Sequence, residues 1–129
     1  MFEHTVETDK SVDEAVRALE QSLANHKFGV LWKLDIPTKL MEKGIQLDQE
    51  YVVLEVCNPD VAKKVLSRNQ KAGYFLPCKV VVYKEKETGK THIGLTLPTA
   101  LLALTGDEGL KPVAEDVEAT MIRAIEEAK

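Results

Sequence analysis

The feature that most constrains the fold is the valine-rich, mainly apolar run at 51–57, together with the dipeptide that follows it. A run of this length and composition is typical of a β-strand. Asn58 is a good N-cap and Pro59 suits the first helical position, so a helix begins directly where the strand ends. The pattern therefore predicts a strand that passes without a linker into a helix, which continues to about Gln70.

The other elements are predicted by equally local signals. Ser11 and Glu14 form a capping box that opens a helix, and the apolar residues after it recur at helical spacing. Further strands are expected at residues 2–8, 28–36, 79–85 and 91–97, short helical segments at 38–44 and 98–104, and a last helix from residue 112. The order β-α-β-β-α-β-β-α indicates an α+β fold, with an antiparallel or mixed sheet of about five strands and helices on one face.

Length, charge and cysteine content narrow the class of protein. With 129 residues the chain is expected to form one domain, residues 1–129. The net charge of -4 argues against nonspecific binding to nucleic acid or to an anionic membrane, because no excess of Lys and Arg can replace counterions. No apolar run approaches a membrane span, and the first residues lack the features of a signal peptide. Two cysteines do not make a disulfide scaffold, so we expect a cytoplasmic protein with reduced thiols.

The candidate functional residues centre on the two cysteines, Cys57 and Cys78. Cys57 directly precedes a predicted helix N-terminus, where free backbone N–H groups and the helix dipole stabilise a thiolate. A thiol in that position reacts readily or ligates a metal. The competing interpretation is a small buried residue packed beneath the helix, which is the commonest state of a free cysteine.

Cys78 follows Pro77 and begins the next predicted strand. If the helix after Asn58 crosses the sheet, the strands before and after it are parallel, and the two cysteines lie at opposite edges of the sheet. A disulfide needs α-carbons within about 7 Å of each other. We therefore expect no disulfide between Cys57 and Cys78.

The chain carries no complete catalytic signature. None of its serines lies in a nucleophile elbow, and no glycine-rich phosphate loop follows a predicted strand. His4 and His92 could join the cysteines in a zinc site, but the close ligand spacing that identifies such sites is missing.

Aromatic residues suggest a second place for a site. Trp32, Lys33, Tyr51 and Tyr83 could line one face of the sheet, which predicts either a small-ligand pocket between sheet and helix or ordinary packing. The run at 98–104 is too apolar for an exposed loop on an isolated monomer. It either fills the core or forms a dimer contact.

Several short motifs, in this order, resemble those of the domain of unknown function 302 family. They are Phe28-Gly29-Val30, Asp35-Ile36, Lys43-Gly44, Cys57-Asn58-Pro59, Leu76-Pro77-Cys78 and Val82-Tyr83. The resemblance covers most of the chain and implies an α+β fold like that of the TATA-binding protein, with a curved, mostly antiparallel sheet. It also implies a homodimer. It implies neither a reaction nor nucleic-acid binding, since fold and function separate easily.

The leading hypothesis is a cytosolic, homodimeric binding module for a small ligand or a metal, without catalysis of its own. The candidate ligand-binding residues are Cys57, Asn58, Pro59, Pro77 and Cys78, with backbone amides at 58–60 as donors to an anionic group. One alternative is a thiol-dependent redox protein or enzyme that uses Cys57, and another is an interaction protein that binds no ligand. The sequence identifies no cofactor, and whether a metal is bound stays open.

Overall fold

The protein, described by a computed structural model of residues 1–129, contains a five-stranded antiparallel sheet with the strand order β1-β5-β4-β3-β2. The strands are β1 (Glu3–Thr8), β2 (Gly29–Asp35), β3 (Tyr51–Cys57), β4 (Cys78–Lys84) and β5 (Thr91–Thr96). The predicted α+β class and antiparallel sheet are confirmed. All five strands lie within a residue or two of their predicted positions, and β3 has the predicted bounds.

The helices follow the predicted order, with short additions at the connections. They are α1 (Val12–Asn25), α2 (Ile36–Met41), α3 (Pro59–Arg68), α4 (Pro98–Ala103) and α5 (Lys111–Ala128), with 3₁₀ helices η1 (Gln70–Phe75) and η2 (Glu108–Leu110). The capping box of α1 is present, because Ser11 Oγ accepts from the Glu14 amide and the Glu14 carboxylate accepts from the Ser11 amide. Helix α2 begins earlier than predicted, because Asp35 caps it by accepting from the Thr38 amide at 3.2 Å.

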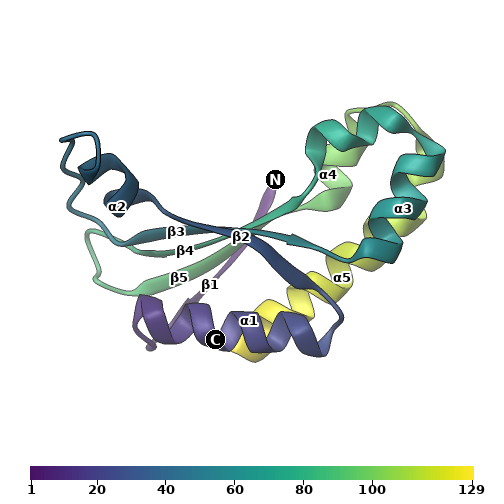
Figure 1. Cartoon of the computed structure of the whole chain (residues 1–129). Coiled ribbons are helices and arrows are strands. Elements are labelled where there is room, and N and C mark those ends of the chain that lie inside the picture. The colour runs from purple at the N-terminus through teal and green to yellow at the C-terminus, as the bar shows by residue number, and fades with distance from the viewer.

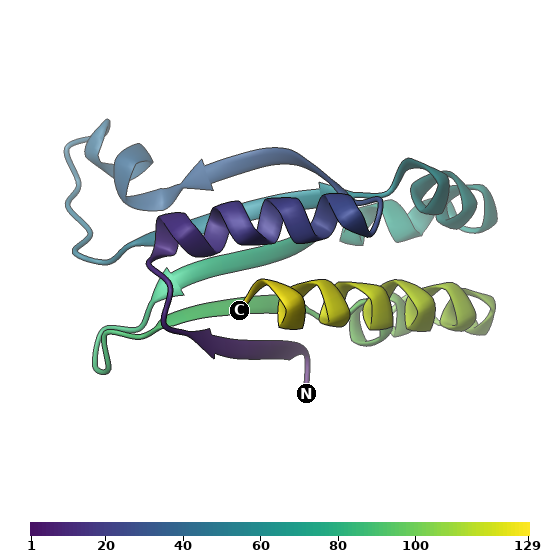
Figure 2. The same cartoon turned by 90° about the horizontal axis from the view of Figure 1, so that it is seen from below.

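The helices are arranged so that one face of the sheet is covered and the other is open. Helices α1 and α5 lie side by side beneath the sheet and run in opposite directions (Figures 1 and 2). Helix α2 rises at one end of the strands, and α3 and α4 rise at the other end (Figure 1). The side of the curved sheet opposite α1 and α5 is therefore covered by no helix, and we call it the open face (Figure 1).

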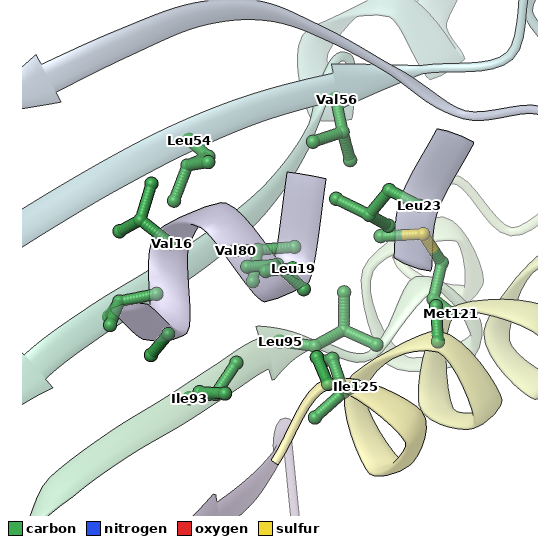
Figure 3. Close-up of a cluster of buried hydrophobic side chains, with 14 of the residues drawn as sticks. Val16, Leu19, Leu23, Leu54, Val56, Val80, Ile93, Leu95, Met121 and Ile125 are labelled. Atoms are coloured by element: carbon green, nitrogen blue, oxygen red, sulfur yellow. The ribbon is translucent and has the colours of Figure 1, made fainter. Parts of the chain in front are cut away.

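The main hydrophobic core lies between the sheet and the two long helices. Leu19 and Leu23 of α1 and Ile125 of α5 are fully buried against alternate residues of the strands, among them Leu54 and Val80 (Figure 3). Because side chains alternate across a strand, the apolar residues of β3 and β4 that do not enter this core point to the open face.

A second, smaller core organises the end of the molecule where α3 and α4 lie. Its members are Val65, Ala72, Leu102, Leu110 and Ala114, contributed by α3, η1, α4, η2 and α5. The apolar run at 98–104 is thus partly a core segment, since Leu102 is buried in this cluster while Leu104 is exposed. None of the helices is both long enough and apolar enough to cross a membrane.

The expected relation between β3 and β4 is wrong. Helix α3 does not cross the sheet; with η1 it forms a lobe beyond the ends of the strands, and the chain re-enters the sheet beside the place where it left (Figure 1). Strands β3 and β4 are therefore antiparallel, with Val56 opposite Cys78 and Glu55 opposite Lys79. The two cysteines therefore lie near each other, where β3 ends and β4 begins, rather than at opposite edges of the sheet.

Replacing Leu54 by Ala tests the main core. Leu54 is 0% exposed, so its truncation removes buried apolar area and leaves a cavity between β3 and α1. We expect a loss of about 2–5 kcal/mol in the free energy of unfolding, measured by urea denaturation. Leu104→Ala is the matched control, because Leu104 is 73% exposed, and it should change that free energy by about 0.5 kcal/mol or less. Equal effects of the two variants would contradict the position of the core.

Candidate functional site

The predicted site residues gather at the junction between the sheet and the helical lobe. The chain leaves β3 at Cys57, forms α3 and η1, and returns at Cys78, which lies next to Cys57 because it pairs with Val56. Pro77, whose peptide bond with Leu76 is cis, directly precedes β4. The structure therefore brings together residues that are about twenty positions apart in the sequence.

The two thiols are free and belong to opposite faces of the sheet. Cys78 packs against the main core with Val80 and Val82, whereas Cys57 follows Val53 and Glu55 on the open face. Side chains that point to opposite faces cannot be bridged without movement of the backbone. This orientation, and not the expected distance between the strands, explains why the cysteines are unbridged.

The protonation of both thiols is governed by burial. Burial raises the pKa of the Cys57 thiol above its usual value, and burial together with the nearby Cys57 raises the pKa of Cys78 to about 11. A reactive or metal-ligating thiol needs the opposite shift. Burial therefore opposes the stabilisation of a Cys57 thiolate that we expected from the N-terminus of α3.

Asn58 and Pro59 have structural roles at the start of α3. The Asn58 side-chain oxygen accepts hydrogen bonds from the amides of Asp60 at 3.0 Å and Val61 at 3.2 Å. Pro59 has no N–H group to offer. Of the amides at 58–60 that we expected to bind an anion, that of Asp60 is therefore engaged within the helix, and Pro59 has none.

The open face of the sheet holds a more complete constellation. Its residues fall into rows that cross the strands, because partners in the register share a face. One row is Glu7, His92, Tyr83 and Tyr51; the next is Thr5, Gly94, Val81, Val53 and Leu34; a third contains Lys79, Glu55 and Trp32. The middle row is apolar apart from Thr5, although no helix covers it.

The first row is a connected chain of aromatic and ionisable groups. The rings of Tyr51 and Tyr83 stack with centroids 5.0 Å apart, and His92 meets Tyr83 edge-on at 5.2 Å. The Tyr83 hydroxyl lies 3.3 Å from His92 Nδ1, and His92 Nε2 lies 3.4 Å from a carboxylate oxygen of Glu7. Burial, with the nearby phenol of Tyr51, raises the pKa of Tyr83, so its hydroxyl stays protonated at neutral pH.

A hollow of about 290 Å³ lies on this face above Gly94. A β-carbon at Gly94 would lie 3.1 Å from Thr5 Oγ1 and 3.4 Å from a methyl group of Val81, so the hollow exists because this position has no side chain. Its walls include the aromatic residues Phe2 and Tyr83. The arrangement offers a flat apolar floor with ring-bearing walls.

A larger groove of about 510 Å³ lies beside α2 and the β4–β5 turn, and it is lined by several carboxylates. Three of these carboxylates serve the local backbone and side chains: Asp35 caps α2, Asp48 accepts from Gln46, and Glu85 accepts from the amides of Glu87 and Thr88. We therefore regard the hollow above Gly94 as the better candidate site. The chain holds no group of three or more side chains able to bind a metal ion.

The sequence indicated that the aromatic residues share one sheet face, and left open a pocket between sheet and helix or ordinary packing. Trp32, Tyr51 and Tyr83 do share one face, but it is the open face rather than a pocket between sheet and helix, and Lys33 points the other way toward Glu20. Gly94 and Thr5 were missed. The available signal was the pair of nearly continuous apolar runs in β3 and β4, which predicts apolar residues on both faces of a strand.

The comparisons with known proteins agree with this fold. The family model described as domain of unknown function DUF302 matches residues 4–128, so the chain belongs to that family, as the sequence motifs indicated. It is similar to a solved structure described as an uncharacterized conserved protein DUF302 from Bacillus stearothermophilus. The two share 42% sequence identity over 100% of this chain and 99% of that chain, with a TM-score of 0.95. A search of curated proteins finds no match.

Thiol alkylation at varied pH tests the assignment of the two cysteines. Because burial raises the pKa of both thiols, we expect slow reaction with iodoacetamide at pH 7 and a rate at Cys57 that still rises above about pH 9. Cys78, packed on the core, should react more slowly than Cys57. Peptide mass spectrometry of the native protein, with Cys57→Ser and Cys78→Ser to assign the signals, measures both rates. A Cys57 rate that levels off below pH 7 would contradict this account.

Proposed function

We propose that this protein is a binding module without catalysis of its own, and that its ligand is a small planar molecule held in the hollow above Gly94. The observation that carries the proposal is the apolar row of Gly94, Val81 and Val53 on a sheet face that no helix covers. Antiparallel sheets with one face in water usually carry polar residues on that face. An apolar face in contact with solvent marks a binding surface.

The shape and lining of the hollow favour a ring. Gly94 and Val81 form a flat floor, and the stacked pair of Tyr51 and Tyr83 stands at one side. Phe2, which is 65% exposed, lies at the other rim. Aromatic groups pack against one another in offset or edge-on geometry and add to the free energy of apolar burial. A planar ligand can contact the floor and these rings together.

The proposal keeps the ligand on the face that carries Cys57 but gives the thiol no chemical role. A raised pKa argues against a redox protein or enzyme that uses Cys57 as a nucleophile. The absence of a cluster of metal-binding side chains favours an organic ligand over a metal. Asn58, Pro59, Pro77 and Cys78 then serve to join the helical lobe to the sheet.

Binding of N-phenyl-1-naphthylamine tests the hollow directly. This uncharged aromatic probe fluoresces strongly when it leaves water. We expect saturable binding to the native protein, weakened about threefold or more by Gly94→Ala, which fills the floor, and about tenfold by Tyr83→Ala, which removes a ring. Fluorescence titration gives the dissociation constants.

The control for these variants is Tyr74→Ala. Tyr74 is 86% exposed on η1 and does not line the hollow, so its loss removes a tyrosine without touching the site. Its dissociation constant should equal that of the native protein. No saturable binding, or equal weakening by all three variants, would contradict the proposal and favour an interaction protein that binds no ligand.

We also propose that two copies of the chain associate, as the family resemblance implies. Leu31 and Trp32 on the edge strand β2 support this, because they are 63% and 51% exposed and lie outside the hollow. Neighbouring large apolar side chains that are exposed on an edge strand favour contact with another chain.

The mass of the protein in solution tests this association. We expect light scattering at micromolar concentration to give twice the 14.4 kDa of one chain. Trp32→Glu should shift the mass toward that of one chain, because it puts a charge on the proposed contact. Leu104→Glu, on the exposed end of α4, should leave the mass unchanged. A native protein with the mass of a single chain would refute the homodimer.

A further inference from the structure

Two side chains that line the hollow have fixed and opposite hydrogen-bonding roles, and they indicate which chemical class of ligand the hollow accepts. We infer that the ligand is an uncharged planar ring with a cyclic amide on one edge, so that an N–H donor lies beside a C=O acceptor. This inference rests on the proposed function, because it concerns the ligand of the same hollow.

The two side chains of fixed role are Glu3 and Lys79, and both line the hollow. An ionised carboxylate only accepts hydrogen bonds, and an ammonium group only donates them. Glu3 Oε1 accepts from the Thr5 hydroxyl at 2.6 Å, which leaves the carboxylate with further lone pairs. Lys79 Nζ donates to Glu55 Oε1 at 3.2 Å and keeps two of its three N–H donors. A ligand in the hollow therefore meets an acceptor and a donor.

These two side chains belong to the same wall of the hollow. Thr96 is the register partner of Glu3 on the neighbouring strand. Lys79 lies beside Thr96 on the next strand, because the residues that follow and precede them, Val80 and Leu95, are partners. Neighbouring strands are about 4.8 Å apart, so this wall presents an acceptor, a hydroxyl and a donor in steps of about that length. The stacked tyrosines form the opposite wall, across the apolar floor.

The remaining polar groups adapt to whatever the ligand offers. The hydroxyls of Tyr51 and Thr96 line the hollow without a hydrogen-bond partner in the chain, and a hydroxyl both donates and accepts. The Tyr83 hydroxyl lies 3.3 Å from His92 Nδ1 and shares a proton with that ring. These hydroxyls can bond to either kind of ligand atom, so the selection rests on the two groups of fixed role.

The charges of that wall favour an uncharged ligand. Glu3 repels an anion, and Lys79 repels a cation. A zwitterion can face both groups, but each already has a hydrogen-bond partner, and a charged ligand group loses more hydration than the remaining positions return. A neutral amide edge gives its N–H group to the carboxylate and its carbonyl to the ammonium at a lower desolvation cost. A purely apolar ring leaves both groups without that contact.

Quinolin-2-one and coumarin test the donor half of this edge, because they have the same bicyclic shape and the same carbonyl. Quinolin-2-one has an N–H group where coumarin has a ring oxygen. We expect quinolin-2-one to bind the native protein about twofold to tenfold more tightly, the range given by one hydrogen bond. L-Tryptophan, a zwitterion with a bicyclic ring, should bind more weakly than quinolin-2-one. NMR titration at pH 7 gives the dissociation constants.

Variants identify the groups responsible. Glu3→Leu should reduce the preference for quinolin-2-one, because it removes the acceptor of the N–H group. Lys79→Met should weaken both bicyclic compounds about equally, because both present the carbonyl. The matched controls are Glu115→Leu and Lys43→Met, which change an exposed carboxylate of α5 and an exposed ammonium after α2, neither of which lines the hollow. Both controls should give the dissociation constants of the native protein.

The outcomes separate this inference from the proposed function. If N-phenyl-1-naphthylamine binds saturably but quinolin-2-one binds no better than coumarin, or neither of these two binds, the inference is overturned and the hollow remains a binding site. Tighter binding of L-tryptophan than of quinolin-2-one, or a preference that Glu3→Leu leaves unchanged, overturns it in the same way. Failure of every probe to bind, N-phenyl-1-naphthylamine included, overturns the proposed function and the inference together.

Discussion

The structure depends on the burial of the apolar sides of α1 and α5 against one face of the sheet. Leu19, Leu23 and Ile125 fill that interface, and the Ser22 hydroxyl donates to the Ala124 carbonyl at 2.6 Å between the two helices. A buried hydroxyl needs such a partner, so this bond also fixes how the helices lie against each other. The two longest helices, α1 and α5, are both packed on this side of the sheet.

The open face is the consequence. Helix α2 and the α3–α4 lobe rise beyond the ends of the strands rather than over them, and the smaller core around Val65 and Leu102 holds the lobe together (Figure 1). Strands β3 and β4 still have apolar side chains on the open face. Gly94 leaves a hollow in that surface, and the row from Glu7 to Tyr51 borders it. The packing of α1 and α5 on one face of the sheet thus creates the core and leaves the other face open for a site.

Much of the fold could be predicted from local sequence signals. Asn58 and Pro59 identified the start of α3, and Ser11 with Glu14 identified that of α1, because caps depend on neighbouring residues only. The relation between β3 and β4 could not be predicted in this way. Whether α3 crosses the sheet depends on the partners of Val65, Ala72 and Leu102, which are distant in sequence.

The same reasoning explains what was missed in the site. The cysteines attracted attention because each borders a strand, but their side chains point to opposite faces and burial raises the pKa of both. The hollow depends on Thr5 meeting Gly94, a contact between β1 and β5 that no local pattern contains. Alternation within β3 and β4 was visible in the sequence and could have indicated an apolar open face.

The most direct test of this account is a map of backbone amide shifts during titration with N-phenyl-1-naphthylamine. The account predicts that the largest NMR shift changes fall on Thr5, Val81 and Gly94, which meet at the floor of the hollow. Amides of α1, on the covered side, should change little. Changes concentrated at Cys57 and Asn58, or spread over the helical lobe, would contradict the claim that the open face is the binding site.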